Sequence, residues 1–382
     1  MFKKGDGTLP AIVRQPELLI SIMGEQTHPS LILAGKLEQS LKHVVLLGTK
    51  DVKRKVEDAG AAIAKLLPGV TIEIDDGLPP YNWRQTEEIV GRWIRKDLSA
   101  VLDLTGGTKP MTIGAYRAGT AAGLPMVYVD TRDRHIHSLG EAPCPVPEPE
   151  SFPEIRATVL LRARGFRAAC GEPAPLGQVH RRFITGLFAD PSVWASWTSS
   201  KQRGSCTTER NAVRLPENHN ARDFQTLLEE SGLAECRGPE VCFRMAGDYR
   251  LFTTGIWLER YVADEARKTG APEVLSNWKC FAVSDGRSDQ LPDKPDYEFD
   301  VVLRQRSMLY FISCKTGKVE WEDIESFANA VRYLGGIFAK GALATLQPLE
   351  EKLLKKAQRN MIMVWDARQL SELRKHIQTW LQ

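Results

Sequence analysis

The segment AVLDLTGGTKPM, residues 100–111, changes from a strand pattern to the start of a helix at its centre. Its first half is a short apolar run. Its second half offers backbone N–H groups, hydroxyls and an ammonium just before a helix, an arrangement that favours a bound anion. The spacing is neither that of the P-loop, G-x-x-x-x-G-K-[ST], nor that of the dinucleotide fingerprint, G-x-G-x-x-G.

Strand and helix patterns alternate along the first part of the chain. The runs that predict strands are residues 18–23, 43–48, 70–75, 100–105 and 125–130. The patterns that predict helices are residues 31–39, 52–67 and 83–96, with a further helix between the last two strands. This alternation predicts an α/β fold, in which a Rossmann-like, doubly wound parallel sheet carries helices on both faces.

A proline-rich segment divides the chain, because five prolines fall within residues 143–153 and exclude regular structure there. We therefore expect a first domain over residues 1–142 and a linker over 143–154. A connecting region of unspecified structure would follow over 155–244. Residues 245–382 predict a second α/β domain built around an antiparallel hairpin, and 382 residues suffice for such a division.

Composition excludes several classes of protein. The chain is 42% hydrophobic and 26% charged with a net charge of +3, which is typical of a globular protein and leaves a nucleic-acid partner open. Its seven cysteines form no C-x-x-C pair, so we expect a reduced, cytoplasmic protein without a zinc site. The sequence has no signal-peptide pattern and no run of about 18 apolar residues, so no membrane partner is expected.

Four loops leave the carboxyl ends of predicted strands, and ligands of open α/β sheets bind beyond this edge. These loops are residues 24–29, 48–51, 76–82 and 105–109. Two of them contain Gly-Thr-Lys. In TGGTKPM the paired glycines, hydroxyl and cation predict a small phosphate cradle. For GTKD, a plain turn with a lysine at the rim remains the alternative.

The strand end Asp103-Leu104-Thr105 with its glycine loop, and the earlier GEQTHPSL, resemble the ligand loops of CARF domains. CARF domains are Rossmann-like sensors of cyclic oligoadenylates in type III CRISPR immunity, and the resemblance covers about residues 15–140. It implies a homodimer with a ring-shaped activator, cyclic tetra-adenylate, across its two-fold axis. The implied ligand-binding residues are Gly24, Gln26, Thr27, Pro29, Thr49, Lys50, Thr105, Gly106, Gly107, Thr108, Lys109 and Met111.

The segment DYEFDVVLRQRSMLYFISCKTGK, residues 296–318, predicts a hairpin with a turn near residues 304–307. The period of two places Glu298 and Asp300 on one face of the first strand, and Ser313 and Lys315 on one face of the second. Asp300 and Lys315 are therefore expected to meet near one end of the hairpin. A lysine beside a carboxylate suggests a metal and a charge-stabilised transition state.

This hairpin resembles the core of PD-(D/E)xK nucleases, and more closely their CRISPR-associated branch behind a CARF domain. The resemblance implies Asp300 as the first carboxylate, Lys315 as the lysine, and Glu259 as the acid of the first helix. The position two residues before the lysine, usually Glu or Asp, is Ser313, a weak ligand for a hard cation. The candidate catalytic residues are Asp300, Lys315, Glu259, Ser313 and Glu298, with Asp300, Glu259 and Glu298 as ligands of Mg²⁺ or Mn²⁺.

These features together predict a cyclic-oligoadenylate-activated, metal-dependent nuclease that cleaves or nicks DNA, with single-stranded RNA as a further substrate. Ser313 keeps a rival open, namely a ligand-controlled nucleic-acid-binding regulator with a weak or inactive nuclease fold. A structural ion pair between Asp300 and Lys315 is the simplest alternative for the hairpin, and an unrelated nucleotide-binding enzyme is a third. Trp194 and Trp197 are interpreted either as stacking platforms for nucleic acid or as ordinary packing.

Overall fold

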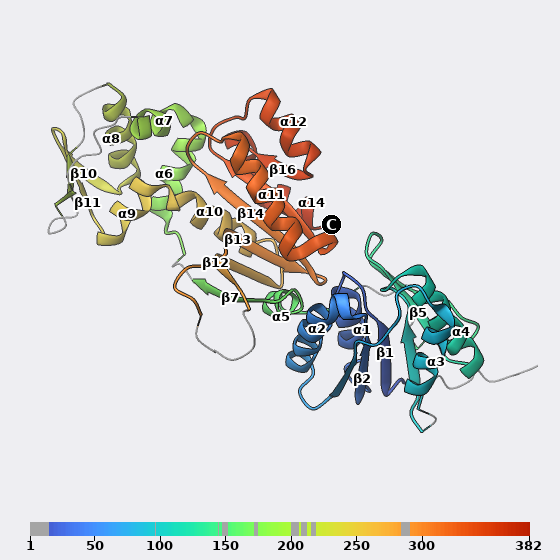
Figure 1. The fold of residues 1–382 in the computed structure, drawn as a ribbon. Coiled ribbons are helices and arrows are strands. Elements are labelled where there is room, and N and C mark those ends of the chain that lie inside the picture. The colour runs from blue at the N-terminus through green and yellow to red at the C-terminus, as the bar shows by residue number, and fades with distance from the viewer. Residues whose placement is uncertain are drawn as a thin grey trace, which may run out of the picture. The chain divides into compact units, whose positions relative to one another are not determined.

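The structure is a computed structural model that describes residues 15–95, 97–143, 145–146, 152–171, 175–199, 206–207, 212–214, 219–283 and 291–382. It divides into two compact units, coloured by residue number in Figure 1. The first comprises Met1–Arg167 and Ala282–Gly286, and the second comprises Ala168–Phe281 and Arg287–Gln382. The four-part division predicted above stays a prediction, although Val146, Phe152 and Ile155, in and beside the proline-rich segment, are buried.

The first unit contains a six-stranded sheet with the order β3-β2-β1-β4-β5-β6. Its strands are β1 (Leu18–Ile22), β2 (His43–Leu47), β3 (Thr71–Asp75), β4 (Ala100–Asp103), β5 (Met126–Asp130) and β6 (His135–Ser138). All pairs are parallel except β5 with β6. The predicted doubly wound sheet is therefore confirmed, and its order reverses between β1 and β4, where such folds bind ligands.

Helices cover both faces of this sheet (Figure 1). The first unit contains α1 (His28–Lys36), η1 (Lys50–Val52), α2 (Lys53–Leu66), α3 (Trp83–Trp93), α4 (Lys109–Ala122) and α5 (Ala157–Arg162). Each of α3 and α4 starts at a side-chain cap: Asn82 accepts from Gln85 N at 3.2 Å, and Thr108 accepts from Met111 N at 3.4 Å. These caps fix where the loops after β3 and β4 end.

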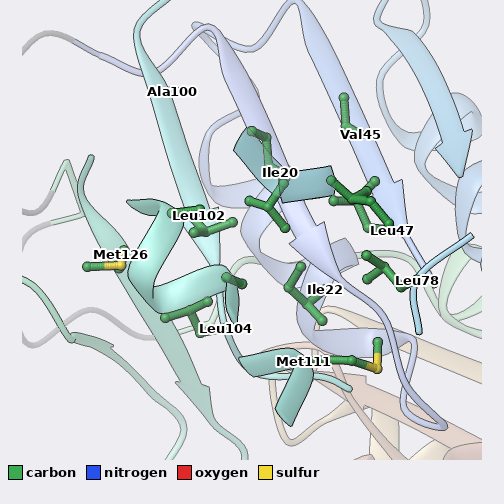
Figure 2. Close-up of a cluster of buried hydrophobic side chains, with 14 of the residues drawn as sticks. Ile20, Ile22, Val45, Leu47, Leu78, Ala100, Leu102, Leu104, Met111 and Met126 are labelled. Carbon is green, nitrogen blue, oxygen red and sulfur yellow. The ribbon is translucent and has the colours of Figure 1, made fainter. Parts of the chain in front are cut away.

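A buried apolar cluster joins one face of the sheet to α3 and α4 (Figure 2). Alternate residues of β1, namely Leu18, Ile20 and Ile22, contribute to it, and the remaining residues of that strand are also buried. A strand covered on both faces reads as a continuous apolar run, which is why the sequence predicts these strands well. The cluster holds the strands in place and so positions the loops at their carboxyl ends.

The second unit contains a six-stranded sheet with the order β16-β15-β14-β13-β12-β7. Its strands are β7 (Phe166–Gly171), β12 (Glu273–Ala282), β13 (Tyr297–Gln305), β14 (Met308–Lys315), β15 (Ala339–Thr345) and β16 (Ile362–Trp365). The expected antiparallel hairpin, β13 with β14, lies at its centre. Arg306 and Ser307, at φ 48° and 55°, form the two-residue turn, whose left-handed backbone matches the twist of paired strands.

The remaining elements of the second unit are helices and a smaller sheet. Its helices are α6 (Gln178–Ala189), α7 (Pro191–Ser199), α8 (His219–Ser231), α9 (Ala246–Thr254), α10 (Ile256–Arg267), α11 (Trp321–Gly335), η2 (Gly336–Phe338), α12 (Glu351–Arg359), α13 (Ala367–Leu370) and α14 (Leu373–Leu381). The smaller sheet has the order β10-β11-β9-β8. Its strands are β8 (Cys206–Thr207), β9 (Ala212–Arg214), β10 (Ala234–Arg237) and β11 (Glu240–Phe243).

Of the two tryptophans in the connecting region, the structure describes the side chain of one. Trp194 is buried, with ring centroids 5.5 Å from Trp257 and 6.2 Å from Phe224, so it belongs to the core. The side chain of Trp197 lies outside the described residues, as do Lys201, Gln202 and Arg203, the basic segment whose charges would accompany stacking on nucleic acid. Within the part of the chain that the structure describes, no helix has the length and apolar character needed to cross a membrane.

Candidate functional site

The loops that follow β1 and β4 lie in direct backbone contact in the first unit. A Cβ atom on Gly106 would lie 2.2 Å from the Ile22 carbonyl oxygen, and one on Gly24 would lie 2.8 Å from the Gly107 nitrogen. Only glycine allows the two backbones to approach so closely. The structure therefore brings together the two segments that carry most of the predicted ligand-binding residues, at the point where strand order reverses.

A buried carboxylate anchors the start of the loop after β4. Asp103 Oδ1 accepts hydrogen bonds from Thr105 N at 2.9 Å and Thr105 Oγ1 at 2.6 Å, and its Oδ2 accepts one from Ser21 Oγ. Burial raises the pKa of Asp103, and these three donors oppose that shift by favouring the ionised form. Because Thr105 Oγ1 also accepts from Val129 N at 2.8 Å, the hydroxyl serves the loop's own structure.

The N-terminus of α4 presents donors and a cation at the same edge. Thr108 caps the helix, and its hydroxyl donates to the carbonyl oxygen of Pro80 in the loop after β3. Gly107 and Lys109 are exposed on either side of this cap. A helix N-terminus with free backbone N–H groups and an ammonium favours a bound anion such as phosphate.

The second Gly-Thr-Lys segment follows β2 and is tied to the neighbouring strand end. Gly48 N donates to Asp75 O at 2.8 Å, and Gly48 O accepts from Leu78 N at 3.0 Å. Thr49 is buried, whereas Lys50 is exposed. Neither Lys50 nor Lys109 forms a salt bridge with any described residue, although Lys53 and, to a smaller extent, Lys50 lower the pKa of Asp76. Both ammonium groups are exposed and so can reach an anionic ligand.

Several of the predicted ligand-binding side chains point into the protein. Met111 is buried in the cluster that Figure 2 draws, beside Ile22 and Leu78. Thr27 is buried and donates to Ala163 O at 2.7 Å, and Pro29 is buried in the first turn of α1. These three buried side chains support the loops and do not face solvent. Gln26 is half-buried, and its Oε1 has no hydrogen-bond partner among the described residues.

In the second unit, α10 starts against the loop that follows β14. Gly255 precedes the helix with φ +88°, and a Cβ atom there would lie 2.5 Å from Thr316 Oγ1. Glycine therefore permits both the left-handed backbone and the close approach. The first turn of α10, which carries Glu259, is thereby brought next to the end of the hairpin that carries Lys315.

Asp300 faces Ser313 across the hairpin. The Ser313 hydroxyl forms a hydrogen bond with the Asp300 carboxylate, and Cys314 N donates to Asp300 Oδ2 at 2.6 Å. Burial raises the pKa of Asp300. The hydrogen bonds from Cys314 N and the Ser313 hydroxyl, and the charge of Lys315, oppose that rise. The hydrogen bonds thus fix the orientation of the carboxylate, while burial makes its ionised form less favourable.

Glu259 shares this electrostatic environment. Burial, followed by the charges of Asp300 and Glu298, raises its pKa to about 7. Glu298 itself is exposed, with Oε1 3.7 Å from Lys279 Nζ. Three predicted carboxylates are therefore within electrostatic reach of one another, although the described residues include no group of three or more His, Cys, Asp or Glu side chains arranged to hold a metal. Hard oxygen donors with excess negative charge fit a divalent cation, which Glu259 and Asp300 would hold.

The ammonium of Lys315 is held by a residue that the sequence interpretation missed. Lys315 Nζ lies 3.1 Å from Asp323 Oδ1 in α11, and Asp323 Oδ2 accepts from Glu320 N at 2.9 Å. Burial would raise the pKa of Asp323, but the bond from Glu320 N and the ammonium of Lys315 lower it below its usual range. An acid three residues after Glu320, in the first turn of a helix, is a capping signal that could have located Asp323.

No protein-family model and no curated protein matches the chain. Solved structures share its fold. Protein VC1899 from Vibrio cholerae has a TM-score of 0.77 at 14% identity, over 95% of this chain and 97% of that one. Can2 from Sulfobacillus thermosulfidooxidans, solved in complex with cyclic tetra-adenylate, has a TM-score of 0.70 at 22% identity, over 96% and 98%.

A type III CRISPR defence DNA nuclease activated by cyclic oligoadenylate has a TM-score of 0.52 at 19% identity, over 92% of this chain and 53% of that one. At these identities the likeness concerns the fold. The predicted architecture is therefore confirmed, with a CARF-like Rossmann unit followed by a nuclease-like α/β unit in one chain.

Proposed function

We propose that this chain is a cyclic-oligoadenylate-activated, metal-dependent nuclease of CRISPR antiviral defence that acts in the cytoplasm. The observation that carries the proposal is the cluster of Glu259, Asp300 and Lys315. Asp300 and Lys315 lie on the hairpin, Glu259 lies on the adjacent first turn of α10, and both carboxyl groups have raised pKa values. Perturbed carboxylates beside a lysine are typical of catalytic sites. The fold shared with Can2 over nearly the whole chain supports the same function.

The activator is proposed to be cyclic tetra-adenylate, bound at the carboxyl edge of the first sheet. Its phosphates would contact the N-terminus of α4 and the exposed ammonium groups of Lys50 and Lys109. Because a ring of four identical nucleotides contains a two-fold axis, one chain would contact half of it and a second copy the other half. The functional form is therefore proposed to be a homodimer that binds one ring per two chains.

In the second unit, Glu259 and Asp300 would hold Mg²⁺ or Mn²⁺, with Glu298 at the exposed side of the site. The ion, when bound, supplies Lewis acidity and lowers the pKa of an attacking water. Asp300 is oriented for this by Cys314 N and Ser313. A bound cation would also offset the charges of Asp300 and Glu298, which add to burial in raising the pKa of Glu259.

Lys315 is proposed to stabilise the negative charge that develops on the phosphate during cleavage. A charged donor that is already in position needs no reorganisation when the reaction occurs. Asp323 supplies that position, because its second oxygen is itself held by the backbone of Glu320. Asp323 is therefore proposed as a positioning residue, which acts on the reaction through Lys315.

The proposed substrate is DNA, with single-stranded RNA as a second substrate. A ligand-controlled nucleic-acid-binding regulator is the second candidate function. Two features favour it. Ser313 lies two residues before Lys315, where the nuclease family that the hairpin resembles usually has Glu or Asp. The described residues also include no group of three or more His, Cys, Asp or Glu side chains arranged to hold a metal. Both candidates use the same activator site, so they differ only in whether the second unit cuts.

Cleavage assays separate the two candidates. Labelled duplex DNA, single-stranded DNA and single-stranded RNA are incubated with the purified chain, with and without each cyclic oligoadenylate, in Mg²⁺ and in Mn²⁺. We expect cleavage that requires both activator and metal, and a loss of about 100-fold in Lys315→Met. Lys318→Met is the matched control, because Lys318 is exposed and pairs with Glu320 instead. A wild-type chain that binds cyclic tetra-adenylate but cuts nothing in either metal would establish the regulator.

A further inference from the structure

The loop between β3 and α3, residues 76–82, touches both Gly-Thr-Lys segments of the first unit. Leu78 N donates to Gly48 O at 3.0 Å in the segment that follows β2. The carbonyl oxygen of Pro80 accepts from Thr108 Oγ1 in the segment that follows β4. The loop therefore spans the interval between the two segments that present Lys50 and Lys109.

The same loop is fixed at both of its ends. Asp76 Oδ2 lies 3.0 Å from Lys53 Nζ at the start of α2, and Asn82 caps α3. Leu78 is buried in the core cluster. With these anchors the backbone of the loop is held to the sheet, to α2 and to α3.

The aromatic side chain of this anchored loop is exposed to solvent. Tyr81 is 82% exposed, a larger fraction than any other large hydrophobic side chain in the part of the chain that the structure describes. A single exposed aromatic ring is common on protein surfaces and needs no explanation by itself. The position of this ring distinguishes it, because Tyr81 follows Pro80, whose carbonyl oxygen accepts a hydrogen bond from Thr108 at the N-terminus of α4.

Cations and an aromatic ring at one sheet edge match the two parts of a nucleotide. Ammonium groups and helix N-termini contact phosphate, and the face of an aromatic ring stacks on a base. We propose that Tyr81 stacks on an adenine base of the cyclic activator and contributes to its recognition. This inference rests on the proposed function. It assigns recognition of the base to residues 76–82, whereas the proposed phosphate contacts come from the other loops.

Titration calorimetry with cyclic tetra-adenylate tests the proposal on the full chain. We expect Tyr81→Ala to raise Kd by about 10-fold or more, and Tyr81→Phe and Tyr81→Trp to stay within about threefold of wild type, since both retain a ring. The matched control is Tyr333→Ala, because Tyr333 is 59% exposed and belongs to the second unit. Because Tyr81 is exposed, the variants are expected to fold, which circular dichroism checks.

The preference of the chain for adenine over uracil rings is a second measurement. It would not change if Tyr81 served only to stabilise the loop. Stacking is stronger for purines, so wild type should bind cyclic tetra-adenylate more tightly than cyclic tetra-uridylate, and Tyr81→Ala should reduce that ratio. A wild-type chain that binds the adenylate ring, with Tyr81→Ala binding it equally well, overturns the stacking role and leaves the proposed function intact. A wild-type chain that binds no cyclic oligoadenylate overturns the proposed function and this inference with it.

Discussion

The raised pKa of Glu259 makes the free energy of unfolding depend on pH in a predictable direction. Burial and the charges of Asp300 and Glu298 move this pKa from 4.5 to about 7. Between these values the folded chain keeps a proton that the unfolded chain has released. Unfolding therefore releases a proton, and the free energy of unfolding falls as pH rises through this window. Glu259→Gln, which cannot ionise, should lack this contribution.

The size of the effect follows from the shift. At about 1.4 kcal/mol per pKa unit, the metal-free wild type should lose about 3 kcal/mol at most between pH 4.5 and pH 8, since water partly screens a half-buried carboxyl. Relative to wild type, Glu259→Gln should gain stability over that range by the same amount. Glu298→Gln removes one of the two neighbouring charges and should lower the pKa of Glu259. The loss of stability with rising pH should therefore be complete at a lower pH than in wild type.

Urea unfolding in EDTA, followed by tryptophan fluorescence at several pH values, measures this difference. The signal reports mainly on the second unit, because all tryptophans except Trp83 and Trp93 belong to it. Midpoints and slopes give the free energy of unfolding at each pH. If wild type and Glu259→Gln lose stability in parallel from pH 4.5 to pH 8, Glu259 does not retain a proton in the folded chain and the reasoning fails.

Three further predictions concern the two sites. Asp323→Asn should lower kcat for nucleic-acid cleavage about 10-fold with little change in KM, because Lys315 keeps its charge but loses its fixed position; a change in KM alone would contradict a positioning role. Ser313→Glu should preserve or raise Mg²⁺-dependent cleavage, measured as rate against Mg²⁺ concentration, whereas a lower rate would mean that another acid already fills that place. Lys109→Ala should weaken binding of cyclic tetra-adenylate by about 1–3 kcal/mol without unfolding the chain, and unchanged affinity in calorimetry would remove this loop from the site.

The sequence predicts the first unit more completely than the second for a physical reason. Strands buried on both faces, such as β1, appear as uninterrupted apolar runs. The strand β15, AKGALAT, gives no such signal because small residues are required there: a Cβ on Gly341 would lie 2.6 Å from Ile362 Cδ1 and 3.1 Å from Phe327 Cε1. The low strand propensity of these small residues is thus overridden by their packing against Ile362 and Phe327, which is visible only in the folded structure.

Some site residues could be predicted from local sequence pattern, whereas others depend on partners that are distant in the sequence. The side-chain period of a strand and a two-residue turn place Asp300 and Lys315 on one hairpin, so local pattern predicts them. Asp103 depends on Ser21 of a strand far away in the sequence, and Lys315 depends on Asp323 of the next helix. Contacts of this kind arise from the order of strands and the start of a helix, which a single sequence does not display.

The left-handed turn at Arg306 and Ser307 limits how this chain can change over generations. A tight turn fixes strand register, and a slip of one residue exchanges the two faces of a strand. Because side chains alternate between the two faces, inserting or deleting one residue between Asp300 and the turn, an interval of about 17 Å of strand, would carry the carboxylate to the opposite face. Substitutions between Asp300 and Lys315 can accumulate, but the interval itself must keep its length. Among distant descendants, that fixed interval should outlast the residues within it.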